Sequence, residues 1–188
     1  MRQECGLALG NQSNDDVARV AHLLQAPVRA EVRAWLPERP ADAWRDALEW
    51  ERQPQWMSDA ASVRVMSSRR EGVGVRLAVK TRVLGVPVFT EILEVVVWEP
   101  PHRVALAHRG FVQGMGEWTF RERAEGTWVR WTETLRLPVP ILGAAVLAVY
   151  RPILVRLMRR SLEALRLYVH TASRDDVGPS HHPSVTDQ

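Results

Sequence analysis

The stretch GEWTFRERAEGTWVRWTETLRL, residues 116–137, decides the fold of this chain because it predicts two strands joined by a turn at Glu125-Gly126. Antiparallel pairing aligns three residue pairs on one face: Phe120 with Val129, Trp118 with Trp131, and Gly116 with Glu133. The apolar members identify this face as the inner one, because side chains of a strand alternate between the two faces. Glu133 is therefore predicted to be an inward-pointing acid, beside a glycine that leaves room for it.

The rest of the chain extends this hairpin into an antiparallel sheet. Alternating apolar and polar residues predict five more strands, at residues 28–36, 62–67, 74–83, 88–99 and 103–109. Two short helical segments, residues 41–48 and 50–58, follow the first strand, and a long helical tract ends near residue 169. This order of elements is typical of the α+β class.

The last helical tract is amphipathic. At about 100° per residue, one side collects Tyr150, Leu154, Met158, Ser161, Leu165 and Tyr168. The opposite side collects Arg156, Arg159, Arg160, Glu163 and Arg166. Pro152 removes a backbone donor, so we expect a kink there, with residues 141–150 as a separate turn or short helix.

Length and composition indicate one globular domain with polar ends. The 188 residues, 46% of them hydrophobic, suffice for one core. We expect residues 27–172 to form this domain, residues 1–26 to be a short helix or a disordered extension, and residues 173–188 to be a disordered tail. Lys80 is the only lysine, so 24 of the 25 basic residues are arginines, but the net charge is only +3. Without a dense basic cluster, we expect no nucleic-acid partner.

The composition also restricts the expected location of the protein and the cofactors it could bind. Cys5 is the only cysteine, which excludes an internal disulfide and a cysteine-based zinc site. Residues 1–16 contain no apolar segment of signal-peptide length, and charges and prolines interrupt the apolar stretch at 135–150. We therefore expect a cytoplasmic protein with no integral membrane segment, no metal and no cofactor. The sequence leaves a homodimer open.

A series of short motifs points to a known family. The motifs are Trp44-Arg45-Asp46, EWERQPQW (49–56), WEPPHR (98–103), GTWVRW (126–131), Arg151-Pro152 and RRSLEAL (159–165). With them, residues 28–169 resemble the START-like SRPBCC superfamily, which includes polyketide cyclases/dehydrases and lipid-transport proteins. The resemblance implies a helix-grip fold: a curved antiparallel sheet wraps around the long C-terminal helix, and two short helices follow the first strand. It also implies a cavity between sheet and helix for a hydrophobic ligand.

His108 and Glu133 are the candidate acid–base pair. His108 is in phase with Val104 and Leu106, so it is predicted to point inward like Glu133. Buried carboxylates and imidazoles have shifted pKa values and can exchange protons with a substrate. The alternatives are that the two side chains only line the cavity, or that they are structural, Glu133 being paired with an arginine.

Aromatic and apolar side chains are the candidate ligand contacts. Trp56, Trp118 and Trp131 offer flat apolar faces for a planar ligand, with ordinary core packing as the alternative. Tyr150, Leu154 and Met158 on the inner side of the long helix either meet the ligand or pack in the core. Trp128 is in phase with Arg130 and is expected outside.

Three functions follow from these residues. The first is binding of a lipid, isoprenoid or polyketide-like molecule in the cavity. The second is a cyclase or dehydratase with His108 or Glu133 as acid–base group, since aromatic polyketide cyclases of the superfamily are similar at Ala107-His108-Arg109. Those enzymes carry an arginine at a position near Val96 or Val97 and a tyrosine near Ala60, and these positions are apolar here. The third is contact of the arginine-rich outer surface with an acidic partner or an anionic membrane surface.

Overall fold

A computed structural model describes residues 27–83, 85–139 and 142–175 of the chain. The described strands form one antiparallel sheet in the order β1-β7-β6-β5-β4-β3-β2. They are β1 Val28–Leu36, β2 Ala60–Val65, β3 Arg76–Val83, β4 Val86–Glu99, β5 Arg103–Arg109, β6 Gln113–Arg123 and β7 Gly126–Arg136. Helix α2 (Pro40–Ala47) and the 3-10 helix η1 (Trp50–Gln55) follow β1, and α3 (Leu142–Asp175) follows β7. The predicted α+β helix-grip fold is confirmed.

The pairing of β6 with β7 has the predicted register. Phe120 lies opposite Val129, Trp118 opposite Trp131, and Gly116 opposite Glu133. All of these side chains except that of glycine are buried, whereas Trp128, on the other face of β7, is 46% exposed. The hydrophobic pattern of the hairpin therefore determined which face meets the core.

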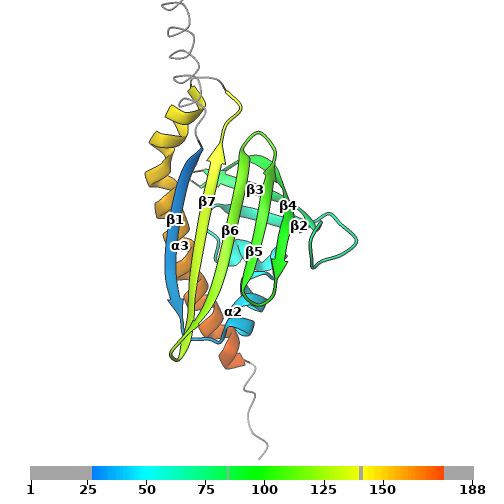
Figure 1. Cartoon of the computed structure of the whole chain (residues 1–188), viewed down its shortest axis with the longest axis vertical. Helices are drawn as coiled ribbons and strands as arrows, with labels where there is room; N and C mark the ends of the chain where they lie inside the picture. Colours follow the sequence, from blue (N-terminus) through cyan, green and yellow to red (C-terminus); the bar gives the residue numbers. More distant parts are fainter. Residues whose placement is uncertain (1–26, 84, 140–141, 176–188) are drawn as a thin grey trace, which may run out of the picture.

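Helix α3 runs along the sheet beside β1 and β7 and closes the core (Figure 1). Its side chains Met158 and Leu165 are almost completely buried, as the helical period predicted, and so is Leu162, which was not placed on the inner side in advance. They share one cluster with Phe120 and Val129 of the hairpin. Burying an apolar side chain of this size contributes about 1.5–3 kcal/mol, so these contacts stabilise the packing of the helix on the sheet.

The prediction of a separate element before Pro152 is wrong. Helix α3 is continuous from Leu142 to Asp175, with Pro152 inside it. Proline leaves the carbonyl four residues earlier, that of Ala148, without its helical donor. Both residues lie on the exposed side of the helix, where water can hydrogen-bond to that carbonyl. The helix also continues three residues beyond the expected domain end at 172, while residues 1–26 and 176–188 lie outside the described residues.

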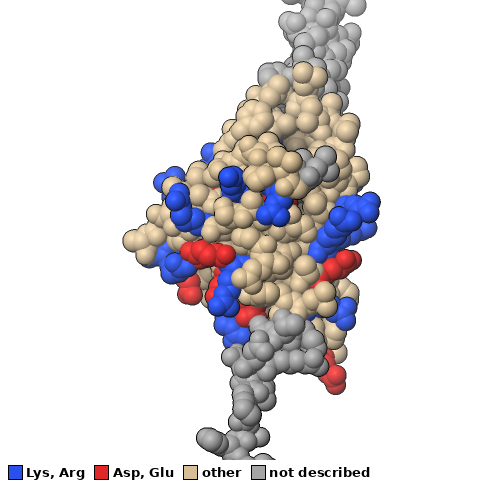
Figure 2. All heavy atoms as spheres, turned by 180° about the vertical axis from the view of Figure 1, so that it is seen from behind, with Lys and Arg blue, Asp and Glu red and all other residues tan. Residues whose placement is uncertain are grey.

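The outer surface carries interspersed rather than segregated charge. The predicted outward residues Arg156, Arg159, Arg160 and Arg166 of α3 are exposed. Elsewhere arginines pair with acids, as Arg33 does with Glu31 and Arg109 with Glu94. Figure 2 shows basic and acidic side chains next to one another on one face, whose upper end carries almost no charge. On α3 itself, Leu142, Val146, Val149 and Ile153 are exposed apolar residues that the sequence analysis did not place outside.

Candidate functional site

A cavity of about 140 Å³ lies between the inner face of the sheet, η1 and α3. Most of its wall is apolar, with Trp118 and Trp131 from the β6–β7 hairpin and Leu154 from α3. One part of the wall is ionisable and consists of Asp59, Glu91, His108 and Glu133. Among the residues that line the cavity in the described structure, none is a lysine or an arginine.

His108 bridges two buried glutamates. Its Nδ1 lies 3.3 Å from Glu91 Oε2, and its Nε2 lies 3.2 Å from Glu133 Oε2. The strand register brings the three together: Leu93 lies opposite His108, and Glu91, two residues before Leu93, shares its face of β4. Glu133 reaches His108 from β7, on the far side of β6. Both glutamates are more than nine-tenths buried.

The two carboxylates decide the protonation state of His108. Burial alone would lower the pKa of the imidazole, but the hydrogen bonds and charges of Glu133 and Glu91 outweigh it and raise the pKa to about 10. At neutral pH His108 is therefore an imidazolium that donates one N–H to each glutamate. With both donors engaged, it has no N–H left for a ligand.

The carboxylates of the cluster differ in how many of their oxygens accept hydrogen bonds. Glu133 Oε1 accepts a hydrogen bond of 2.7 Å from the Trp131 indole N–H, so both its oxygens are engaged. In contrast, Glu91 Oε1 and Asp59 Oδ1 are shielded from solvent and have no hydrogen-bond partner among the described residues. A buried acceptor without a partner is costly and usually has a role or a missing partner.

Asp59 is a carboxylic acid whose pKa is raised. Burial is the largest cause that raises its pKa, to about 6, and the negative charges of Glu133 and Glu91 act in the same direction. Burial, followed by the charges of Asp59 and Glu91, also raises the pKa of the nearby Tyr150 phenol. The ionisable part of the cavity is thus an anionic region within an apolar wall.

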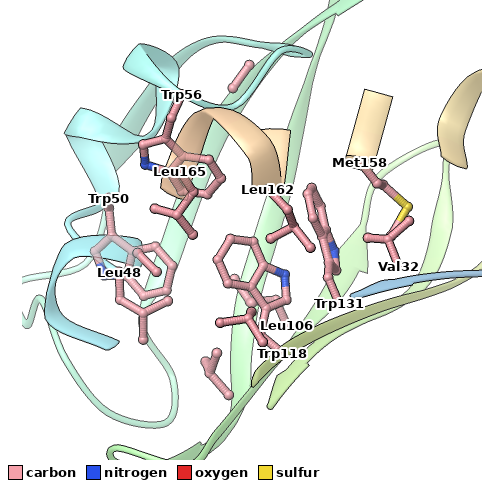
Figure 3. Close-up of a cluster of buried hydrophobic side chains, with 14 of the residues drawn as sticks. Val32, Leu48, Trp50, Trp56, Leu106, Trp118, Trp131, Met158, Leu162 and Leu165 are labelled. Atoms are coloured by element: carbon pink, nitrogen blue, oxygen red, sulfur yellow. The ribbon is translucent and has the colours of Figure 1, made fainter. Parts of the chain in front are cut away.

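The structure brings most of the predicted site residues together. His108, Glu133, Trp118, Trp131, Tyr150 and Leu154 all line the cavity. Trp56 and Met158 are not among its lining residues. Trp56 packs behind Trp118, with the ring centroids 5.6 Å apart, and Met158 is buried on the far side of Trp131 in the core (Figure 3). Packing thus places these two in the core, the alternative that the sequence analysis had also allowed.

Asp59 and Glu91 were not predicted from the sequence. Extending the hairpin register by two strands, through β5 to β4, would have found Glu91, because it is in phase with Leu93, which lies opposite His108. Asp59 lies between η1 and β2, where no period applies, so no sequence signal marks its direction. Across the described residues, no three His, Cys, Asp or Glu side chains are arranged to hold a metal ion.

Comparisons with known proteins agree with this architecture. The family model described as "Polyketide cyclase / dehydrase and lipid transport" matches residues 27–170. Among solved structures, TTHA0849 from Thermus thermophilus is similar, with a TM-score of 0.67 and 23% identity over 78% of this chain and 99% of that one. No curated protein matches the chain.

Two further solved structures share the fold at lower identity. A START superfamily protein from Mycobacterium smegmatis has a TM-score of 0.58 and 10% identity over 77% of this chain and 98% of that one. The di-domain ARO/CYC StfQ from the steffimycin biosynthetic pathway has a TM-score of 0.65 and 13% identity over 93% of this chain and 63% of that one. In the described residues, no helix is long and apolar enough to cross a membrane.

Proposed function

We propose that this chain, which belongs to the polyketide cyclase / dehydrase and lipid transport family, binds a small molecule with an apolar body in the cavity between sheet and helix. The sequence resemblance to the START-like SRPBCC superfamily is confirmed by that match. The observation that carries the proposal is the cavity itself, which combines an indole-lined apolar wall with one ionisable region. Such a combination is typical of small-molecule sites, where apolar contacts give affinity and a few polar groups fix orientation.

The size of the cavity limits what fits without rearrangement. An apolar cavity of roughly 150 Å³ holds one benzene molecule in another protein, so about 140 Å³ accommodates a single ring. Sites for drug-sized ligands are larger, about 300–1,000 Å³. A lipid or a polyketide must therefore displace lining side chains or leave part of its length outside. Tyr150, half-buried on α3, is one of the lining side chains that are not enclosed on all sides.

Filling the cavity tests the proposal. Val79 lines it and is buried, whereas Val88 is exposed and does not line it. Val79→Phe should abolish binding of a one-ring probe such as benzyl alcohol, and Val88→Phe, the same change outside, should leave it intact. Binding is measured by ligand-observed NMR, and folding of both variants by circular dichroism. If folded Val79→Phe binds the probe as the native chain does, the proposal is wrong.

The ionisable cluster favours a second candidate, a cyclase- or dehydratase-type enzyme. Such chemistry needs a base close to a carbonyl compound in the cavity. His108 is a poor base because it is already protonated and both its N–H groups are engaged. Asp59, with a pKa near 6 and an oxygen without a partner, is better suited. In this proposal His108 and Glu133 hold the cluster together rather than transfer the proton.

Deuterium exchange distinguishes an enzyme from a protein that only binds its ligand. Acetophenone has one ring and acidic methyl protons that exchange slowly in buffered D₂O. A base in the cavity should accelerate this exchange above the buffer rate, and Asp59→Asn should abolish the acceleration. Asp42→Asn, on α2 and outside the cavity lining, is the control and should leave the rate unchanged. If acetophenone binds but its methyl protons exchange only at the buffer rate, the enzyme proposal is wrong and the binding proposal remains.

A further inference from the structure

We propose that the cavity selects an apolar amine, whose ammonium group is held by Asp59 and Glu91. This inference rests on the proposed binding function and specifies the class of ligand. It follows from three features of the cavity: two acceptor oxygens without partners, a wall without Lys or Arg, and a histidine whose donors are already used.

The two acceptors are the first feature. Glu91 is only 8% exposed, lines the cavity and has an Oε1 atom with no hydrogen-bond partner in the described structure. Asp59 is only partly buried, but it also lines the cavity, and its Oδ1 atom is shielded from solvent and has no hydrogen-bond partner in the described structure. Two acceptors require donors, and an ammonium carries three N–H groups and no acceptor. A hydroxyl has only one donor, so it satisfies one of the two oxygens.

Net charge is the second feature. Three carboxyl groups, from Asp59, Glu91 and Glu133, line the cavity against the one imidazolium of His108. Tyr150 is the other titratable side chain of the lining, and its raised pKa keeps it neutral. At pH 7.5 Asp59 is mostly ionised as well, because its pKa is about 6. The region is therefore anionic and attracts a cation, while a ligand carboxylate is repelled.

His108 is the third feature, because it is the residue that could otherwise bind an anion. Its Nδ1 and Nε2 lie within 3.3 Å of Glu91 and Glu133, so the imidazolium neutralises the protein's own carboxylates. Glu133 is further held by Trp131. This leaves Asp59 and Oε1 of Glu91, the oxygens without partners, for the ligand's ammonium group, while the indoles of Trp118 and Trp131 contact its apolar body.

Three probes of equal size test this assignment at pH 7.5: benzylamine, benzyl alcohol and benzoate. We expect benzylamine to bind at least about tenfold more tightly than benzyl alcohol, because its ammonium adds charge–charge attraction to its hydrogen bonds with the carboxylates. Benzoate should show no binding. Glu91→Gln and Asp59→Asn should each reduce the ratio of the affinity for benzylamine to that for benzyl alcohol several-fold. Glu94→Gln, on the outer face of the same strand and paired with Arg109, is the matched control and should leave the ratio unchanged.

The binding results distinguish a failure of the amine assignment from a failure of the proposed ligand-binding function. If benzyl alcohol binds as tightly as benzylamine, or benzoate binds best, the amine assignment is wrong and the cavity still binds ligands. If none of the three probes binds the folded native chain, the binding function is wrong as well. Because the native chain alone decides between these results, a variant that fails to fold does not affect the test. Isothermal titration calorimetry gives the three dissociation constants.

Discussion

Gly116 of β6 lies directly opposite Glu133 of β7, and a Cβ atom at position 116 would lie 2.7 Å from Glu133 Oε1. That oxygen is the one that accepts the hydrogen bond from Trp131, and the other oxygen contacts His108. The absence of a side chain at residue 116 therefore gives Glu133 the space in which it holds both partners. A glycine in the middle of a strand is usually unfavourable, and here its use is to admit a buried carboxylate.

Gly116→Ala should move the Glu133 carboxylate and weaken its two hydrogen bonds. The side chain can shift, so we expect a moderate loss of about 1–3 kcal/mol in the free energy of unfolding. Urea denaturation gives this loss, and the ¹⁵N shift of the Trp131 indole reports the broken bond. Gly110→Ala is the control, because its added Cβ meets only Glu91 Cγ at an ordinary 3.9 Å. An unchanged Trp131 indole resonance in Gly116→Ala would contradict the role assigned to this glycine.

His108→Gln should destabilise the fold strongly. Glutamine removes the positive charge and leaves Glu91 and Glu133 as buried like charges on either side of it. Breaking a buried charge pair by removing one partner costs about 3–5 kcal/mol. His102→Gln, at an exposed turn, should change the free energy of unfolding by less than about 0.5 kcal/mol. Equal stabilities of the two variants in chemical denaturation would show that the bridge contributes nothing.

The sequence predicted the hairpin and the direction of its side chains better than it predicted the cavity. Glu133 and His108 were found because strand alternation fixes the face on which a side chain lies, once one apolar pair is aligned. Trp56 and Met158 are apolar and buried like Trp118, yet they pack behind the wall. Periodicity places a side chain on the inner side, but only three-dimensional packing decides whether it contacts a cavity or another side chain.

The two oxygens without partners could not be predicted for a related reason. Asp59 lies in a connection, where no alternation applies, and its direction depends on how η1 packs against the sheet. Glu91 lies in a strand whose first half is mostly exposed, so its burial depends on which part of β4 the helix and η1 cover. The direction of Asp59 and the burial of Glu91 therefore depend on how several elements pack together, and the sequence of a single element does not determine them.

Leu162→Ala tests the contact of α3 with the sheet. Leu162 is 1% exposed and belongs to the central cluster, so its truncation should lower the free energy of unfolding by about 2–5 kcal/mol. Leu142→Ala is the matched control on the same helix, because Leu142 is 63% exposed. We expect its effect to stay within about 0.5 kcal/mol. Thermal and urea denaturation measure both, and a loss in Leu142→Ala as large as in Leu162→Ala would mean that another surface covers the start of α3.

Stability should fall as the pH rises from about 6.5 towards 10. The pKa of His108 is about 10 in the folded chain, against 6.5 as the ordinary value, so the folded state retains a proton that the unfolded state has lost. Its contribution is complete below pH 6.5 and disappears as the pH passes 10. The decline should amount to a few kcal/mol, on the order of 1.4 kcal/mol for each pH unit between the two pKa values. Asp59 has the same sign at lower pH: its raised pKa makes stability fall between about pH 3.8 and 6.

Urea denaturation at intervals from pH 6 to 10 measures this slope, and His108→Gln should remove most of it. The control His102→Gln should retain the native slope, since that histidine is outside the cluster. An NMR titration of the His108 ring nitrogens gives the pKa directly and should show an imidazolium throughout the neutral range. A His108 that loses its proton below pH 7 would contradict both the slope and the charge balance on which selection of an amine depends.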